Sequence, residues 1–227
     1  MLPSQTVENY LKTIYLAQAN RSSEELVPMG QLAAALRVVP GTATTMMKTL
    51  AESGLVRYEP YMGVRLTEAG EKLASLVLRR HRLIELFLVK VLRMSWAEVH
   101  AEAEQLEHAV SEHLIDRIDE MLGRPEVDPH GDPIPTAEGR MPRADHVDLL
   151  TAPVATRLVV TRVADQDPEF LRFVEQHHLM PGSEVTIETR EVSSDAVRLR
   201  CEGGETVSIG ARAAAKVFAT FAPLESV

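Results

Sequence analysis

The chain contains a single cysteine, Cys201, among its 227 residues. One thiol cannot form an intramolecular disulfide, and it cannot supply the cysteine pairs of a zinc finger. Because this scarcity is typical of proteins from a reducing compartment, the sequence predicts a cytoplasmic protein.

Long apolar segments are missing as well. No run approaches the roughly 18–20 apolar residues that a membrane-spanning helix needs. The N-terminus also lacks the basic stretch and apolar core of a secretory signal. Apolar residues still make up 45% of the chain, which is ample for ordinary globular cores. We therefore expect one large or two to three small domains and no membrane partner.

Motifs of metal-dependent catalysis are absent too. The chain has no His-Glu-x-x-His sequence, and it lacks the pair of Glu-x-x-His helices that a di-iron bundle requires. No Ser-His or Cys-His pairing is evident. The sequence thus predicts a protein that is not an enzyme and has no small organic substrate.

The net charge of −9 is unevenly distributed. Residues 1–65 carry six Lys/Arg against five Asp/Glu, whereas residues 66–122 carry seven against eleven. This balance argues against non-specific coating of DNA, so any DNA contact needs a locally basic face on the first segment. A bound cation would neutralise part of the acidic middle.

The first third of the chain has the order of a winged helix-turn-helix. Apolar spacing predicts helices over residues 4–19, 29–36 and 42–53, with Thr42 as the N-cap of the third. Residues 55–58 and 63–66 then read as two strands. Helix, helix, turn, helix and hairpin predict a DNA-binding domain over residues 1–66 with a double-stranded operator as partner.

The rest of the chain divides into three parts. Residues 67–123 hold two long helical patterns, 67–93 and 96–122, which are typical of a dimerisation scaffold and predict a homodimer. Residues 124–153 contain six of the thirteen prolines and read as a linker. Residues 154–227 show strands at 155–163, 184–189, 197–200 and 206–209 with a helix at 168–177, as in a small β-barrel. The predicted class is mainly α with a small β domain.

Histidines and glutamates cluster in the predicted scaffold. His81 and Glu85 lie four residues apart, and a second run contains His100, Glu104, Glu107 and His108. On one continuous helix, the four residues of the second run would share one face. A lone histidine is usually structural, but several imidazoles and carboxylates grouped together are suitable ligands for Mn(II), Fe(II) or Zn(II). The pattern predicts a metal site.

The candidate DNA contacts lie on the third helix and the hairpin. They are Thr42, Thr44, Thr45, Lys48, Thr49, Arg57, Tyr61 and Arg65. Hydroxyls can meet phosphates or base edges, and a threonine methyl can pack on a thymine methyl. The third helix has no arginine or glutamine for a bidentate base contact, so specificity would rely on packing and DNA shape. The alternative is an ordinary solvated helix and loop.

Six short motifs occur in a characteristic order. They are Glu8–Tyr15, Ser53–Val56, Leu66–Gly70, Arg80–Glu85, Val99–His108 and Pro129–Pro135. Together they resemble the diphtheria-toxin-repressor family of iron- and manganese-dependent regulators over essentially the whole chain. The resemblance implies a winged helix-turn-helix, a helical metal-binding and dimerisation domain, and an SH3-like barrel similar to the ferrous-iron-transport A domain.

The resemblance also implies ligands. The primary metal site would use Asn9, Glu104, Glu107 and His108, with His81 in the same cluster. Iron-responsive members have cysteine where this chain has Glu104, which favours Mn(II) over Fe(II). The chain departs from the manganese-responsive pattern at two positions. Asn9 stands where those members usually have aspartate, and Lys12 stands where members with a two-metal site have a further glutamate.

An ancillary site is implied in two alternative forms. One uses His81, Glu85 and His100 with groups from the barrel. The other uses Glu85, Asp128, His130 and Asp165. The sequence leaves both open. It predicts a Mn(II)- or Fe(II)-activated repressor of metal-uptake genes; the alternatives are a regulator answering to an organic ligand, with structural histidines, and a metalloenzyme.

Overall fold

The structure is a computed structural model that describes residues 4–19, 21–22, 25–142, 146–191 and 195–222. The chain forms two compact units. The first contains residues 1–81, 107–110 and 135–142, and the second contains residues 82–106, 111–134 and 143–227. No helix among the described residues is long and apolar enough to span a membrane.

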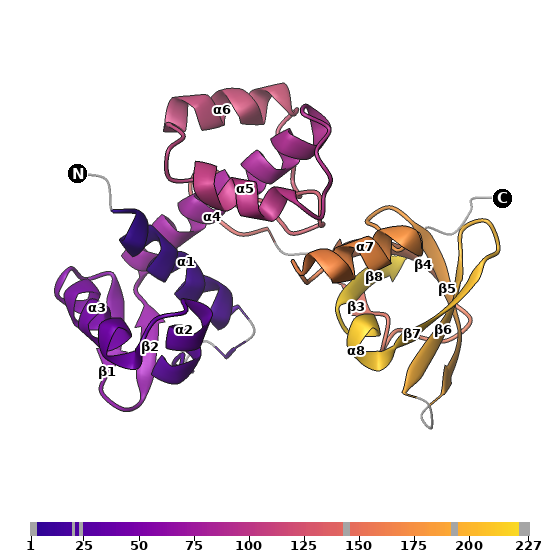
Figure 1. Ribbon diagram of the computed structural model, residues 1–227, viewed down its shortest axis with the longest axis horizontal. Helices are drawn as coiled ribbons and strands as arrows, with labels where there is room; N and C mark the ends of the chain where they lie inside the picture. Colours follow the sequence, from indigo (N-terminus) through magenta and orange to yellow (C-terminus); the bar gives the residue numbers. More distant parts are fainter. Residues whose placement is uncertain (1–3, 20, 23–24, 143–145, 192–194, 223–227) are drawn as a thin grey trace. The chain divides into compact units, whose positions relative to one another are not determined.

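The first unit contains the DNA-reading elements expected from the sequence (Figure 1). They are α1 (Gln5–Gln18), α2 (Met29–Ala35), α3 (Pro40–Glu52), β1 (Val56–Glu59), β2 (Gly63–Leu66) and the beginning of α4 (Glu68–Lys90). The strands pair antiparallel, with Val56 opposite Leu66. Leu11, Met47 and Val64 are fully buried between the helices and the hairpin, so apolar burial fixes α1 and α3 on one core.

The helix α3 begins earlier than the sequence indicated. Its N-cap is Val39 and Pro40 occupies the first turn, a position where a missing amide hydrogen costs nothing. The prediction of Thr42 as the N-cap was therefore wrong. Thr42 lies inside the helix and is exposed.

The second unit contains the end of α4 and two shorter helices, α5 (Val99–Leu106) and α6 (Glu112–Met121). The prediction of one helix over 96–122 was wrong, because Ser111 caps a new helix by accepting a hydrogen bond from the Leu114 amide. Glu107 and His108 follow α5 and belong to the first unit. They do not continue a helical face with His100 and Glu104.

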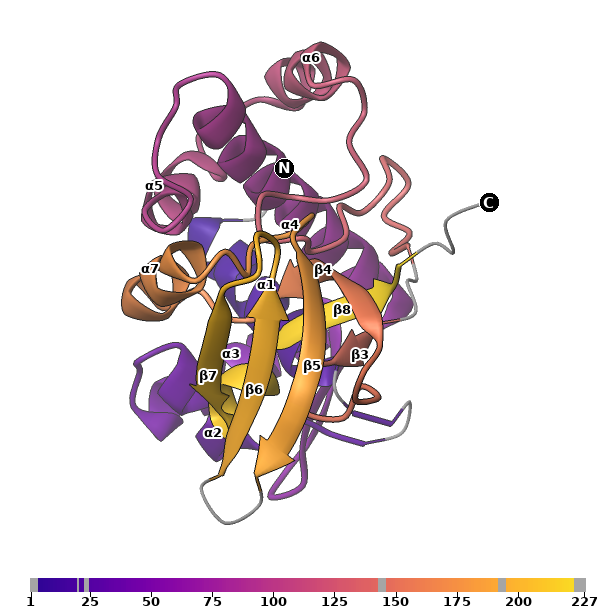
Figure 2. The same ribbon diagram turned by 90° about the vertical axis from the view of Figure 1, so that its right-hand side faces the viewer.

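The remainder of the second unit is a six-stranded antiparallel sheet (Figure 2). Its elements are β3 (Val147–Asp148), β4 (Arg157–Val163), α7 (Pro168–Gln176), β5 (Glu184–Glu191), β6 (Ala196–Cys201), β7 (Thr206–Gly210), α8 (Ala211–Ala214) and β8 (Val217–Phe221). The order is β3-β8-β4-β5-β6-β7. Across the described residues β3 and β7 do not pair, so the sheet is open where a closed barrel was expected. The short strand β3, β8 and α8 were not predicted.

The proline-rich segment is more than a linker. The Asp128 Oδ1 atom accepts hydrogen bonds from the amides of His130 and Asp132, at 2.8 and 2.9 Å. Gly131 has φ +84°, and a Cβ there would lie 1.9 Å from the Thr161 carbonyl oxygen of β4. Only glycine fits such a position. This turn therefore buries Asp128 and His130 against the sheet.

Candidate metal centre

Three potential metal-binding atoms converge beside α1 in the first unit. The His108 Nε2 atom lies 2.7 Å from Asn9 Oδ1 and 3.2 Å from Glu107 Oε1. Asn9 comes from α1, whereas Glu107 and His108 come from the short segment after α5. The structure thus brings together residues about one hundred positions apart.

Four further side chains surround these atoms and form the α1 cluster with them. Lys12 Nζ lies 2.6 Å from Glu107 Oε1, and His81 Nδ1 lies 2.5 Å from Glu107 Oε2. Glu8 contacts both Arg80 and His108, at 2.6 and 2.5 Å. Glu107 is fully buried, Asn9 is half-buried, and the other five side chains are at least nine-tenths buried. Desolvated charges at these distances interact far more strongly than they would in water.

The carboxyl group of Glu107 is kept ionised. Burial alone would raise its pKa, but the hydrogen bond and charge of His81 and those of Lys12 outweigh burial and lower the pKa below its ordinary value. An ionised carboxylate is the form that ligates a metal.

The donor atoms suit a divalent cation. Two ligand atoms at right angles on a metal with bonds of about 2.1 Å are about 3 Å apart, close to the two separations around His108 Nε2. Carboxylate and amide oxygens with one imidazole nitrogen are typical of Mn(II), Fe(II) and Zn(II) rather than of sulfur-preferring ions. The residues therefore fit the metal that the sequence suggested.

Glu104 belongs to the second unit, whereas Glu107 and His108 belong to the first. It lies on α5, is exposed, and its Oε1 is 4.0 Å from His100 Nε2 one helical turn away. Its role in the same site as Glu107 and His108 remains a prediction.

A second group of candidate ligands lies in the second unit around Glu85. This group, the Glu85 cluster, consists of Glu85 from α4, His100 from α5, and Asp128 and His130 from the buried turn. Glu85 Oε1 lies 3.1 Å from His100 Nδ1, and Glu85 Oε2 lies 3.9 Å from His130 Nδ1. Ligand atoms of Glu85, Asp128 and His130 all lie within 4.8 Å of one another. The Glu85 carboxylate thus lies near residues of both ancillary sets expected from the sequence. His100 belongs to the first set, and Asp128 and His130 belong to the second.

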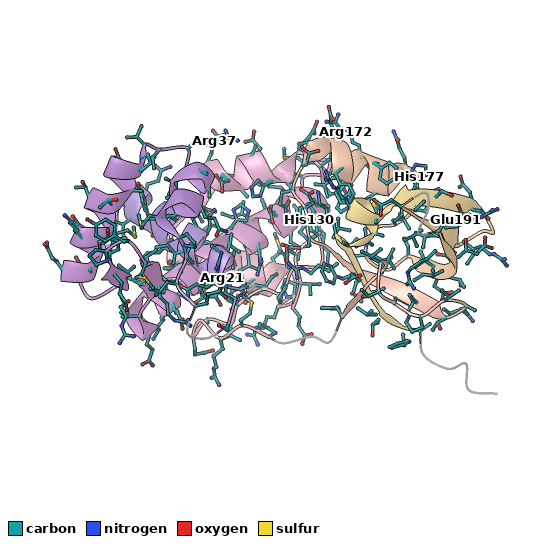
Figure 3. The ribbon with its side chains drawn as sticks, turned by 90° about the horizontal axis from the view of Figure 1, so that it is seen from below. Arg21, Arg37, His130, Arg172, His177 and Glu191 are labelled. Atoms are coloured by element: carbon teal, nitrogen blue, oxygen red, sulfur yellow. The ribbon has the colours of Figure 1, made fainter. Side chains whose placement is uncertain are left out.

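His130 has an unsatisfied nitrogen that faces the two carboxylates. It lies among the closely packed side chains of its unit and is fully buried (Figure 3). Its Nε2 donates to the Trp96 carbonyl oxygen at 2.9 Å, while its Nδ1 has no hydrogen-bond partner among the residues that the structure describes. Burial lowers the pKa of His130, which favours the neutral ring with a lone pair on Nδ1. A buried lone pair near two carboxylates is what a cation would satisfy.

The ionised carboxylate of Asp128 is in an unfavourable electrostatic environment. Burial, followed by the negative charges of Asp132 and Glu85, raises its pKa well above the ordinary value. Arg82 lies 3.7 Å from Asp128 and 3.6 Å from Asp132, and it only partly compensates. A divalent cation would relieve this repulsion.

Asp165 has another partner. It forms an ion pair with Lys216 and accepts a hydrogen bond from the Asp167 amide. Burial would raise its pKa, yet the Lys216 hydrogen bond and backbone amides lower it. Asp167 is the N-cap of α7, so this acidic pair also has the local role of shaping a turn. As a ligand Asp165 would have to release Lys216.

The candidate DNA contacts are mostly exposed. The hydroxyls of Thr44, Thr45 and Thr49 donate to the carbonyl oxygens four residues earlier on α3. Their remaining lone pairs and methyl groups are the parts available to a partner. Tyr61, at the tip of the hairpin, is fully exposed and has φ +65°, whereas Arg65 is half-buried and lies 4.0 Å from Glu71.

Glu8, Lys12 and Arg80 were not among the candidate site residues. Glu8 and Lys12 are four residues apart on α1, and both flank Asn9. That spacing was a usable signal, but an exposed acid and base at i and i+4 look the same in sequence. Their long-range partners distinguish them.

Family models match three parts of the chain. The N-terminal DNA-binding domain of iron-dependent repressors matches residues 3–64, and their metal-binding and dimerisation domain matches residues 67–136. A FeoA domain matches residues 147–220. These matches agree with the three modules that the sequence resemblance implied.

Known repressors are similar along most of the chain. The iron-dependent repressor IdeR of Mycobacterium tuberculosis (strain ATCC 25618 / H37Rv) is 32% identical over 219 residues, which are 90% of this chain and 92% of that protein. The HTH-type transcriptional regulator MntR of Lysinibacillus sphaericus (strain C3-41) is 33% identical over 121 residues, 53% of this chain and 84% of that protein. These relatives place the chain among regulators rather than among metalloenzymes.

A solved structure of a manganese-dependent transcriptional repressor in complex with manganese aligns with a TM-score of 0.88. It is 38% identical and covers 95% of this chain and 100% of that one. ScaR with bound zinc aligns with a TM-score of 0.78 at 30% identity, covering 97% and 100%. By its length-wide similarity to these proteins and by its matched domains, the chain belongs to the iron-dependent repressor family of metal-dependent, DNA-binding transcriptional regulators.

Proposed function

We propose that the protein is a repressor of metal-uptake genes that responds to Mn(II) in preference to Fe(II). The observation that carries this proposal is the convergence of Asn9 Oδ1, Glu107 Oε1 and His108 Nε2 beside α1. Oxygen donors and an imidazole favour Mn(II), and Glu104 in place of a cysteine supports the same preference. A metal ion bound there would fasten α1, and with it the winged module, to the segment after α5.

The primary site takes one metal ion. Lys12 places an ammonium group 2.6 Å from Glu107 Oε1, where a second cation would need a negative ligand. A protonated lysine has no lone pair and repels a divalent ion. His81, through Glu107, orients the primary ligands rather than joining a two-metal cluster.

The ancillary site is centred on Glu85. Asp128 and His130 are its principal partners, because all three are buried and their ligand atoms lie within 4.8 Å. His100 joins them through Glu85. Asp165 completes the set only when Lys216 releases it.

Operator binding uses exposed and half-buried side chains of α3 and the hairpin. Thr42, Thr45, Lys48 and Thr49 face bases and phosphates, and Arg57, Tyr61 and Arg65 contact the neighbouring backbone or minor groove. The protein acts in the cytoplasm as a homodimer, since paired readers must meet half-sites about one DNA turn apart. The C-terminal domain has the SH3-like fold implied by the resemblance.

Operator affinity measured by fluorescence anisotropy tests the proposal. The DNA comes from upstream of the protein's own gene and of manganese-transporter genes. Binding is measured with chelator, Mn(II), anaerobic Fe(II) and Zn(II), for wild type, Glu107→Ala and the exposed control Glu102→Ala. We expect tightening with Mn(II) in wild type and control and none in Glu107→Ala. Equal affinity with chelator and metal would exclude a metal switch.

A further inference from the structure

Glu8 lies one position before the ligand Asn9, and its carboxylate is buried between two partners. Its Oε1 accepts a hydrogen bond from Arg80 Nη2 at 2.6 Å, and its Oε2 lies 2.5 Å from His108 Nδ1. Neither carboxylate oxygen faces solvent appreciably, since the side chain is 9% exposed. Glu8 is therefore not simply a surface charge on α1.

The Glu8 carboxylate determines which nitrogen of His108 carries the hydrogen. An ionised carboxylate accepts hydrogen bonds and cannot donate them, so Nδ1 is the donor. In the neutral ring the lone pair then belongs to Nε2. That atom lies 2.7 Å from Asn9 Oδ1 and 3.2 Å from Glu107 Oε1, the two oxygens with which it would hold the metal.

Arg80 keeps Glu8 in this orientation. It lies on α4 directly before His81 and pairs with the oxygen of Glu8 that His108 does not use. The arrangement resembles the carboxylate–histidine pairs that support metal-bound imidazoles, in which the outer group sets the tautomer and the ring orientation.

We infer that Glu8, held by Arg80, is a positioning residue that presents His108 Nε2 to the metal. This inference rests on the proposed function. It extends the site from the residues that touch the metal to a buried pair that joins α1 to α4. Glu8 itself does not contact the metal.

Replacing Glu8 with glutamine reverses the hydrogen-bond direction. Arg80 only donates hydrogen bonds, so it takes the glutamine oxygen and leaves the NH₂ group facing His108 Nδ1. The ring then accepts at Nδ1 and carries its hydrogen on Nε2, where it blocks the metal. If Arg80 is also replaced by methionine, the amide can turn its oxygen back to His108. The double variant should therefore recover part of what the single variant loses.

Two measurements test this on the full-length protein. Mn(II) affinity is measured by titration for wild type, Glu8→Gln, Glu8→Gln/Arg80→Met and the control Glu25→Gln, which alters an exposed pair with Arg21. We expect Glu8→Gln to bind Mn(II) about 10–100-fold more weakly, the double variant to recover part of that loss, and the control to match wild type. Nitrogen-15 NMR of labelled histidines in the metal-free protein, above the histidine titration range, reports the His108 tautomer.

The supporting result is an Nδ1-protonated His108 in wild type and the double variant and an Nε2-protonated ring in Glu8→Gln. The same tautomer in wild type and Glu8→Gln would overturn the inference, as would unchanged Mn(II) affinity in a folded Glu8→Gln protein. A double variant no better than the single one would reduce Glu8 to a structural role. If wild type bound no Mn(II), the proposed function would fail, but the tautomer measurement would still decide the role of Glu8.

Discussion

Lys12 and Glu107 are separated by 95 positions in the chain, yet they form a buried ion pair with 2.6 Å between Nζ and Oε1. The same carboxylate accepts from His81. A fixed positive charge thus already lies against the acid that a metal would bind. Removing this charge should make the metal ion more important for stability.

Lys12→Met leaves Glu107 buried with one positive neighbour fewer. We expect the metal-free variant to lose about 3–5 kcal/mol in free energy of unfolding, and Mn(II) to restore part of it by supplying positive charge. Urea denaturation with chelator and with Mn(II) measures both effects. Lys48→Met, at an exposed position of α3, should leave both values at wild type. A Lys12→Met protein as stable as wild type in chelator would show that the pair contributes nothing.

Asp128→Asn should stabilise the metal-free protein at neutral pH. The pKa of Asp128 is raised in the folded state by burial and then by Asp132 and Glu85. The ionised form is therefore disfavoured by folding, and its cost grows as pH rises from the unfolded pKa and is complete above the folded pKa. Asparagine keeps an oxygen for the amides of His130 and Asp132 but carries no charge.

The measurement for Asp128→Asn is urea unfolding in chelator over a range of pH. The stability difference from wild type should increase as pH rises and then level off. The variant should also lose about tenfold or more in affinity at the ancillary site. A variant less stable than wild type at every pH would mean that the Arg82 contact outweighs the repulsion.

Gly131→Ala should disturb the buried turn that carries Asp128 and His130. A methyl group would meet the Thr161 carbonyl oxygen at 1.9 Å, and φ is +84°. We expect a loss of about 3 kcal/mol or more. Gly123→Ala is a matched control, because φ is +78° there but no atom of the described part of the chain lies within 4 Å of the added atom; it should cost only about 1 kcal/mol. Thermal unfolding of both variants checks the difference, and equal costs would count against close packing at Thr161.

Cys201 should react slowly in the folded protein. Burial, followed by the charge of Glu205, raises the pKa of its thiol, and the sulfur donates to the His177 carbonyl oxygen at 3.4 Å. Since only the thiolate is nucleophilic, iodoacetamide should label the native chain far more slowly than the urea-unfolded chain. Mass spectrometry of timed samples measures the two rates, and similar rates would contradict the buried placement.

The sequence was sufficient for the modules and insufficient for the contacts between distant segments. The first helix, the hairpin predicted with strands at 55–58 and 63–66, and α7 were visible in local periodicity and caps. The break after Leu106 was missed because Glu107 and His108 continue an apparent helical pattern, although their partners lie on α1. The strand β8 was missed because the turn directly before it, at Ala215 and Lys216, contains no glycine or proline that would mark it in the sequence.

The candidate site was likewise predicted only in part: ligand-type residues close together in the chain were found, and contacts from distant segments were not. His81, Glu85, Glu107 and His108 stood out because several ligand-type residues occur close together in the chain. Arg80 did not stand out, and Lys12 did so only as a departure from the manganese-responsive pattern. The contacts of both come from burial against residues far away in sequence. The burial of Asp128 and His130 likewise depends on Gly131 fitting against β4, which no local pattern reveals.

The donor set beside α1 contains an amide oxygen, a carboxylate and an imidazole, and no sulfur. Peroxide attacks thiolates first, and the one thiol of this chain is buried in the core of the sheet. The response to manganese should therefore survive oxidative conditions that would disable a sensor with a cysteine ligand. A cell could continue to read its manganese supply while its thiols are being oxidised.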